Sequence, residues 1–217
     1  MLFRSPDSGH LGDIMAVSVM PSATERLRRA VGSDGEVLGD AFSRGRYATD
    51  ASAYQMMPAA VVIPRTMDAA IVAMLASADL GLPVTARGGG TSQCGQTVNS
   101  GVIIDGSRHL DRVLDLDVAG RRCRVEPGIV LDELNRALKP HGLWFPVDVS
   151  TASRATIGGM AGNNSCGGRS LRYGTMRDNV LAIDAVLADG TPMRFDEVAP
   201  DLSDVPSNDP RRTLFQD

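Results

Sequence analysis

The hydrophobic positions of the chain fall into short segments in which strand-like runs alternate with helix-like stripes. Residues 59–63 read Ala-Ala-Val-Val-Ile, a continuous apolar run that is typical of a buried parallel strand. Thr66 can cap a helix over residues 67–80. A second strand-like run occupies residues 84–86, so this part of the chain is predicted to form a β–α–β unit.

Two further helices and four further strands are predicted from the same periodicities. The helices are expected at residues 22–31 and 130–139, and the strands at residues 102–104, 113–116, 122–125 and 180–187. The core-facing side of helix 67–80 is expected to consist of Ile71, Met74, Leu75 and Ala78, and that of helix 130–139 of Val130, Leu131, Leu134 and Leu138. Residues 188–190 read Ala-Asp-Gly and favour a hairpin turn after the last strand.

Composition excludes several classes of function. The chain of 217 residues is 43% apolar and 22% charged, which is ordinary for a globular protein. Its net charge of −4 and its aromatic content of 4% argue against a nucleic-acid partner. The longest apolar run, residues 69–78, is too short for a membrane span. Cys94, Cys123 and Cys166 form no metal-ligand pair and no disulfide framework, so we expect no metal and a reducing, cytoplasmic location, with peripheral membrane attachment left open.

The two ends of the chain carry little pattern. Residues 1–21 are expected to be an N-terminal extension, of which the first 14 need not be native, and they lack the features of a signal peptide. Residues 22–45 are expected to form a short helical lead-in. Residues 199–217 are polar and contain prolines, and they are expected to begin a linker or insert.

The most informative motif is Arg-Gly-Gly-Gly-Thr-Ser-Gln-Cys-Gly at residues 87–95, directly after the strand at 84–86. Consecutive glycines allow positive φ and let a ligand approach the backbone closely. The N–H groups of such a turn can surround an anion, and Thr91 and Ser92 add hydroxyl donors. Ligands of parallel sheets bind beyond the carboxyl ends of the strands, where this motif lies. The motif therefore predicts a site for the diphosphate of a nucleotide or dinucleotide.

Two common nucleotide motifs do not fit. In a dinucleotide-binding Gly-x-Gly-x-x-Gly motif, Gln93 would occupy the position of the third glycine, and strand rather than helix follows. In a P-loop, Gln96 would stand where the phosphate-binding lysine is needed. Both interpretations are rejected.

A second glycine cluster lies at residues 155–168. It is almost free of bulky side chains, so it is not expected to form a core helix or strand on its own. A flexible linker would not carry the ordered segments 144–148 and 173–179 on either side. Two glycine-rich loops some sixty residues apart indicate a large, extended cofactor held along its length.

These motifs together carry a family resemblance. Their order is RGGGTSQCG, Pro127-Gly128, FPVDVS, ATIGGMAGNNSCGG and YGTMRDNVLAIDAVLADG. It resembles the PCMH-type FAD-binding domain of the vanillyl-alcohol oxidase superfamily, and most of all the D-lactate, D-2-hydroxyglutarate and glycolate dehydrogenase group. The resemblance covers about residues 46–195 and implies an FAD domain over residues 46–198. It also implies an α+β fold in which a small β–α–β lobe and a second mixed α/β lobe hold FAD between them.

The resemblance implies a cofactor role for particular residues. The diphosphate loop is Gly88, Gly89, Gly90, Thr91, Ser92, Gly95 and Gln96. The flavin and ribityl chain are lined by Pro146, Asp148, Ser150, Thr156, Gly158 and Gly159, with Asn163, Asn164 and Gly167 beside them. Gly174, Val180 and Ile183 border the isoalloxazine and adenine. Some relatives attach FAD to a histidine just after the first glycines; Thr91 stands there, which implies non-covalent FAD.

The implied activity is that of an FAD-linked oxidase or dehydrogenase. In this group a hydride passes from C2 of a 2-hydroxy acid to flavin N5, and the base and carboxylate-binding residues lie in a substrate domain after the FAD domain. We therefore expect no catalytic acid or base within these 217 residues, and the electron acceptor is left open. Two alternatives remain: an enzyme like UDP-N-acetylenolpyruvylglucosamine reductase, and a non-catalytic FAD-binding module.

Overall fold

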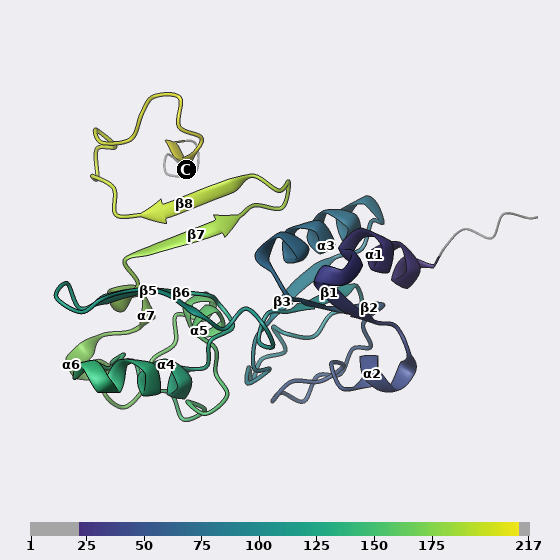
Figure 1. Ribbon diagram of the computed structural model, residues 1–217, viewed down its shortest axis with the longest axis horizontal. Helices are drawn as coiled ribbons and strands as arrows, with labels where there is room; N and C mark the ends of the chain where they lie inside the picture. Colours follow the sequence, from purple (N-terminus) through teal and green to yellow (C-terminus); the bar gives the residue numbers. More distant parts are fainter. Residues whose placement is uncertain (1–21, 213–217) are drawn as a thin grey trace, which may run out of the picture.

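The first lobe is built on a four-stranded sheet, one face of which is covered by the helices at residues 23–31 and 67–79 (Figure 1). The computed structural model describes residues 22–212, so the expected extension at 1–21 lies outside the described residues. The elements of this lobe are α1 (Ala23–Val31), the 3-10 turn η1 (Gly32–Asp34), β1 (Gly35–Leu38), α2 (Ala41–Gly45), β2 (Ala60–Pro64), α3 (Met67–Asp79), β3 (Val84–Arg87) and β4 (Val102–Asp105). The predicted helix 22–31 and the predicted β–α–β unit are confirmed.

The strand order in this sheet is β1-β2-β4-β3. Strands β2, β4 and β3 are parallel, and β1 runs antiparallel at the edge. Strand β4 therefore lies between the two strands of the β–α–β unit. Alternate residues of β2 contribute to cores on opposite faces, Val62 on the helix side and Val61 on the other, which explains its uninterrupted apolar run.

Helices α1 and α3 cover the same face of the sheet (Figure 1). Leu27 and Val31 of α1 are buried there, so the expected lead-in at 22–45 contributes a helix and strand β1 to the first lobe. Ser22 caps α1 with a capping box, and the Thr66 hydroxyl accepts a hydrogen bond from the N–H of Ala69 at 3.1 Å, as its position predicted.

The predicted core face of α3 is wrong in part. Ala69, Ala73 and Ser77 are buried against the sheet, whereas Leu75 and Ala78 are exposed and Met74 packs only at the margin of the core. Because the side chains on this side of α3 are small, the helix can lie close to the sheet. The size of the side chains therefore does not show which side of α3 is buried. Leu75 instead faces the second lobe, where a Cβ built on Gly190 would lie 3.2 Å from its Cδ2.

The second lobe consists of two β-hairpins and several short helices. Its elements are β5 (Val113–Asp117), β6 (Arg122–Val125), α4 (Leu131–Leu138), the 3-10 turn η2 (Lys139–His141), α5 (Ile157–Gly162), α6 (Ser170–Tyr173), α7 (Met176–Asn179), β7 (Ala182–Val186) and β8 (Pro192–Asp196). β5 pairs with β6 and β7 with β8, both antiparallel, and the predicted turn at 188–190 joins the second pair. The predicted strand 180–187 begins two residues late, at Ala182.

The predicted helix 130–139 is confirmed as α4, with Leu131, Leu134 and Leu138 buried. In contrast, the expectation that cluster 155–168 would form no core helix is wrong. Residues 157–162 form α5, because the Thr156 hydroxyl caps the helix and Met160 packs into the lobe's core. The two lobes of mixed elements match the predicted α+β architecture. Within residues 22–212, no helix is long and apolar enough to cross a membrane.

Candidate functional site

The first glycine loop connects β3 to its parallel neighbour β4. A parallel pair needs a crossover, so the loop leaves the carboxyl end of β3 and returns to the start of β4. Gly90 and Gly95 have φ values of 64° and 77°, a backbone conformation that other residues adopt only rarely. Their positions explain why this loop is rich in glycine.

The backbone of this loop is open to a ligand. Within the part of the chain that the structure describes, no N–H group of residues 88–97 donates a hydrogen bond to the protein. The hydroxyls of Thr91 and Ser92 likewise have no hydrogen-bond partner there. Residues 88–97 are half-buried or exposed, so solvent or a ligand can satisfy their N–H groups. A run of ten consecutive available donors next to two hydroxyls suits an anionic ligand.

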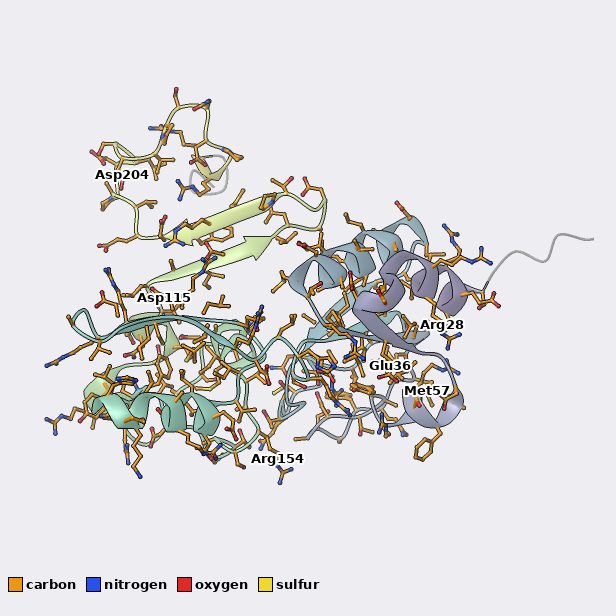
Figure 2. The ribbon with its side chains drawn as sticks, viewed as in Figure 1. Arg28, Glu36, Met57, Asp115, Arg154 and Asp204 are labelled. Carbon is orange, nitrogen blue, oxygen red and sulfur yellow. The ribbon has the colours of Figure 1, made fainter. Side chains whose placement is uncertain are left out.

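The second glycine cluster packs directly on the first loop. A Cβ built on Gly88 would lie 2.0 Å from the Thr156 Oγ1, and one on Gly89 would lie 2.2 Å from the backbone oxygen of Arg154. Figure 2 shows Arg154 at the boundary between the two lobes. In addition, Gln96 donates from Nε2 to Oδ1 of Asn163 at 3.0 Å. The structure therefore brings the two predicted loops together.

These contacts change the expected role of two glycines. Positions 88 and 89 have no room for a side chain, because residues of the second lobe lie where its Cβ would be. At Gly90 and Gly95 a built Cβ would instead meet side chains of the first lobe, Arg87 at 2.5 Å and Tyr54 at 2.7 Å, and the N–H groups from Gly90 to Gln96 have no hydrogen bond within the described residues.

Several predicted residues of the second lobe shape the loops around α5. Gly158 donates its N–H to the Pro127 carbonyl at 2.8 Å, and a Cβ there would lie 2.6 Å from Pro127 Cβ. Gly159 donates its N–H to the Thr156 hydroxyl at 3.3 Å. The Asn163 amide donates back to the Gly159 carbonyl at 2.9 Å. Gly158 and Gly159 thus fix the start of α5 next to the first loop, and Asn163 fixes its end.

Asp148 contacts two residues of the segment that follows α5. Its Oδ1 accepts the N–H of Arg169 at 2.9 Å, and a Cβ on Gly167 would overlap its carbonyl oxygen. The neighbouring predicted residues differ in exposure, because Pro146 is half-buried and Ser150 is exposed. This segment therefore supports the second loop through Asp148 and Gly167.

Three predicted residues, Asn164, Val180 and Ile183, line a groove of about 750 Å³ in the second lobe. Its apolar lining includes Met176, Leu181, Ile183 and Phe195, and its polar lining includes Arg177, Asp196 and Glu197. Asn164 has a φ of 45°, and its Oδ1 accepts hydrogen bonds from the Arg177 N–H at 2.9 Å and the Thr175 hydroxyl at 3.0 Å. Gly174, with a φ of 80°, is the C-cap of α6, two residues before α7 begins.

Comparison with known proteins identifies the family. The family model of the FAD binding domain matches residues 58–196, well over half of the chain. The chain belongs to the FAD binding domain family. The resemblance found in the sequence is thereby confirmed, and FAD is the cofactor that the family binds. The available N–H groups of the first loop are donors of the kind that a diphosphate needs.

The curated relatives are longer proteins. The chain is 44% identical over 165 residues to the D-2-hydroxyglutarate dehydrogenase of Pantoea ananatis, which covers 75% of this chain and 16% of that protein. It is 35% identical over 150 residues to the glycolate oxidase subunit GlcD of Bacillus subtilis, covering 68% of this chain and 32% of the relative. The chain thus spans about one sixth to one third of these relatives.

Solved structures show the same fold. The BBE-like 1 protein of Physcomitrella patens (variant D396N) superposes with a TM-score of 0.70 at 21% identity, covering 81% of this chain and 38% of that one. The 6-hydroxy-D-nicotine oxidase of Arthrobacter nicotinovorans gives a TM-score of 0.67 at 23% identity, covering 76% and 36%. The predicted two-lobed α+β fold is confirmed.

A buried network below the first loop was not predicted from the sequence. The Tyr47 hydroxyl donates to Asp105 Oδ2 at 2.7 Å, and Ser107 donates to Oδ1 through its N–H and hydroxyl. Burial, together with this hydrogen bond to Asp105, raises the pKa of Tyr47 to about 12. Arg87 contacts the same region, with its guanidinium carbon 5.3 Å from the centre of the Tyr47 ring. The only sequence signal was that Arg87 opens the glycine motif.

Proposed function

We propose that this chain is the FAD-binding portion of a flavin-dependent oxidoreductase that oxidises a D-2-hydroxy acid, such as D-2-hydroxyglutarate, D-lactate or glycolate. The observation that carries the proposal is the run of free N–H groups at residues 88–97, next to the second glycine loop. The names of the relatives support the substrate class.

In this proposal the segment from Gly90 to Gln96 donates hydrogen bonds to the FAD diphosphate. A hydrogen bond to a charged group contributes roughly 1.5–3 kcal/mol, so a few of them hold the cofactor without a covalent bond. Thr91 has no ring nitrogen that could form such a bond, and its hydroxyl is available as a further donor. Gly88 and Gly89 contribute by letting the second lobe close on this loop.

The second lobe would hold the rest of the cofactor. The groove at Asn164, Val180 and Ile183 has the apolar lining that a flat ring system needs. The other residues assigned to the cofactor build the walls around it, and all of them except Pro146 and Ser150 have polar atoms that already bond within the protein. They are Pro146, Asp148, Ser150, Thr156, Gly158, Gly159, Asn163, Gly167 and Gly174.

Bound FAD supplies the hydride acceptor. The residues of this chain bind and orient it, and we assign no general base among them. We propose that the base, the groups that bind the substrate carboxylate and the contact with the electron acceptor belong to other parts of the full-length protein. We also propose a reducing compartment such as the cytoplasm, because Cys94, Cys123 and Cys166 are free.

The first experiment titrates FAD into the purified 217-residue protein and follows the quenching of flavin fluorescence. We expect one FAD per chain, competition by ADP, and weaker competition by adenosine, which lacks the diphosphate. Failure to bind FAD would overturn the proposal.

The substrate class needs the full-length protein loaded with FAD. Bleaching of the flavin absorbance by D-2-hydroxyglutarate, D-lactate or glycolate supports the dehydrogenase. Reduction of the flavin by NADPH alone would favour an enzyme similar to UDP-N-acetylenolpyruvylglucosamine reductase. If none of these compounds reduces the flavin, a non-catalytic FAD-binding module is favoured.

A further inference from the structure

We propose that Arg87 is a positioning residue that sets both the shape and the charge of the diphosphate loop. This inference rests on the proposed function, because it concerns how the same loop binds FAD. It is carried by three features of Arg87: its hydrogen bonds, its lack of a carboxylate partner and its place below the glycines.

Arg87 ties the two ends of the loop together. Its Nη1 donates to the carbonyl oxygens of Tyr47 and Thr97, both at 3.3 Å, and its Nη2 donates to that of Thr49 at 2.8 Å. Thr97 is the last residue of the run whose N–H groups are available, ten positions after Arg87. One side chain therefore fixes both ends of the loop against the segment at 47–49.

The guanidinium lies directly below the third glycine. A Cβ built on Gly90 would lie 2.5 Å from Arg87 Nη2, and Gly90 has a positive φ. The positive φ and the missing side chain let the loop curve over the cation. The charge of Arg87 is thus placed next to Gly90, in the segment whose N–H groups have no hydrogen bond within the described residues.

This charge is not neutralised by contact. Within residues 22–212, no carboxylate lies within ion-pair distance of Arg87, and all its hydrogen bonds go to carbonyl oxygens. The two carboxylates that influence it most accept hydrogen bonds from neutral donors instead: Asp50 from the Thr97 hydroxyl at 3.0 Å, and Asp105 from Tyr47. Burial lowers the pKa of Arg87, which means that keeping the cation here costs free energy.

A half-buried cation without a carboxylate partner is costly unless an anion binds near it. The available N–H groups of the loop and the charge of Arg87, which has no carboxylate in contact, both favour an anion at the loop. Arg87 therefore favours the diphosphate electrostatically and also keeps the loop in the shape that receives it.

The test compares FAD affinity over a range of salt concentrations. Arg87→Gln removes the charge and is expected to raise the Kd for FAD at least tenfold and to weaken its dependence on ionic strength. Arg87→Lys keeps the charge but cannot reach all three carbonyls. It is expected to raise the Kd by less and to keep the ionic-strength dependence of the wild type.

Arg44 provides the matched control. It belongs to the same lobe and also donates to a carbonyl, that of Pro58 at 2.9 Å, but within residues 22–212 it has no hydrogen bond to the glycine loop. Arg44→Gln is expected to lower Tm while leaving the Kd for FAD and its salt dependence unchanged.

The outcomes are distinguishable. If the wild type does not bind FAD, the proposed function fails and this inference fails with it. If the wild type binds FAD and Arg87→Gln binds it with the same Kd and the same salt dependence, only the inference is overturned. Equal losses in the Gln and Lys variants with unchanged salt dependence would overturn the electrostatic role. Should Arg87→Gln not fold, Arg87→Lys decides: a raised Kd with retained salt dependence supports the inference, and an unchanged Kd overturns it.

Discussion

Replacing Gly89 by alanine adds one methyl group at a point where the two lobes touch. The new Cβ would lie 2.2 Å from the carbonyl oxygen of Arg154 and 3.0 Å from its carbonyl carbon. Both are backbone atoms, so no side-chain rotation can relieve the contact. The loop and the second lobe must separate by about 1 Å to restore an ordinary van der Waals distance.

The magnitude follows from this separation. Overpacking a well-packed contact costs roughly 1–3 kcal/mol, and the lower chain entropy of unfolded alanine offsets about 0.4–1 kcal/mol of it. For a protein of this size each kcal/mol changes Tm by about 2–4 °C. The separation also moves the N–H groups that follow Gly89. Loss of one hydrogen bond to a charged phosphate, worth roughly 1.5–3 kcal/mol, raises the Kd for FAD at least tenfold.

The assay measures Tm of the protein without flavin by calorimetry and the Kd for FAD by fluorescence. Gly45→Ala is the matched control, because a Cβ at Gly45 meets no atom within 4 Å and its φ is not positive. We expect Gly89→Ala to have a lower Tm and a higher Kd than both the wild type and Gly45→Ala. If all three proteins share one Tm and one Kd, the close approach of the two loops at Gly89 is wrong.

Three further predictions concern titration and cofactor attachment. The raised pKa of Tyr47, about 12 against an ordinary 10.0, gives stability that is present below pH 10 and lost as the pH rises to 12. Tyr47→Phe should flatten this decline in denaturant unfolding, and parallel profiles for the two proteins would contradict it. Hydrogen bonds from Arg112 hold the pKa of Glu126 below its ordinary 4.5, which gives stability that is present above that value and lost as the pH falls through the lower one. Arg112→Gln should therefore destabilise the protein more at pH 7 than at pH 3, and an equal loss would refute the pairing. Finally, acid precipitation of the FAD-loaded protein should release all flavin, because Thr91 offers no attachment; fluorescence retained by the denatured band on a gel would show a covalent bond.

Elements whose signals are local could be predicted from the sequence. Ser22 and Thr66 act as caps within three residues of the N–H groups they accept, so the starts of α1 and α3 were predictable. Helix α4 could be located because its leucines recur at helical spacing on one side. The hairpin turn at 188–190 has a sequence that favours a tight turn, and Gly190 has the positive φ that such a turn uses.

What could not be predicted depends on contacts between distant segments. The sequence of β4 does not say that it inserts between β2 and β3, because strand pairing is decided by long-range packing. Helix α3 is apolar on more than one side, so its buried face follows from what the sheet accepts and not from its periodicity. Helix α5 depends on the cap from Thr156 and on the residues distant in sequence that pack against Met160. The high glycine content of this segment gives no sign of either.

The motif at residues 87–90 shows why composition alone gives an incomplete account of the site. Its four residues have different physical roles: Arg87 ties the ends of the loop, Gly88 and Gly89 admit the second lobe, and Gly90 adopts the positive φ that starts the open segment. Glycine can be required because another part of the protein lies where a side chain would be, or because a ligand does. The sequence alone does not distinguish these two cases. The residue nearest to each built Cβ separates them: it is Thr156 or Arg154 of the second lobe at Gly88 and Gly89, and Arg87 of the same loop at Gly90. It follows that substitutions at Gly88 or Gly89 act on lobe closure and on FAD affinity together, whereas a change in charge at Arg87 acts on the affinity through the salt-dependent field.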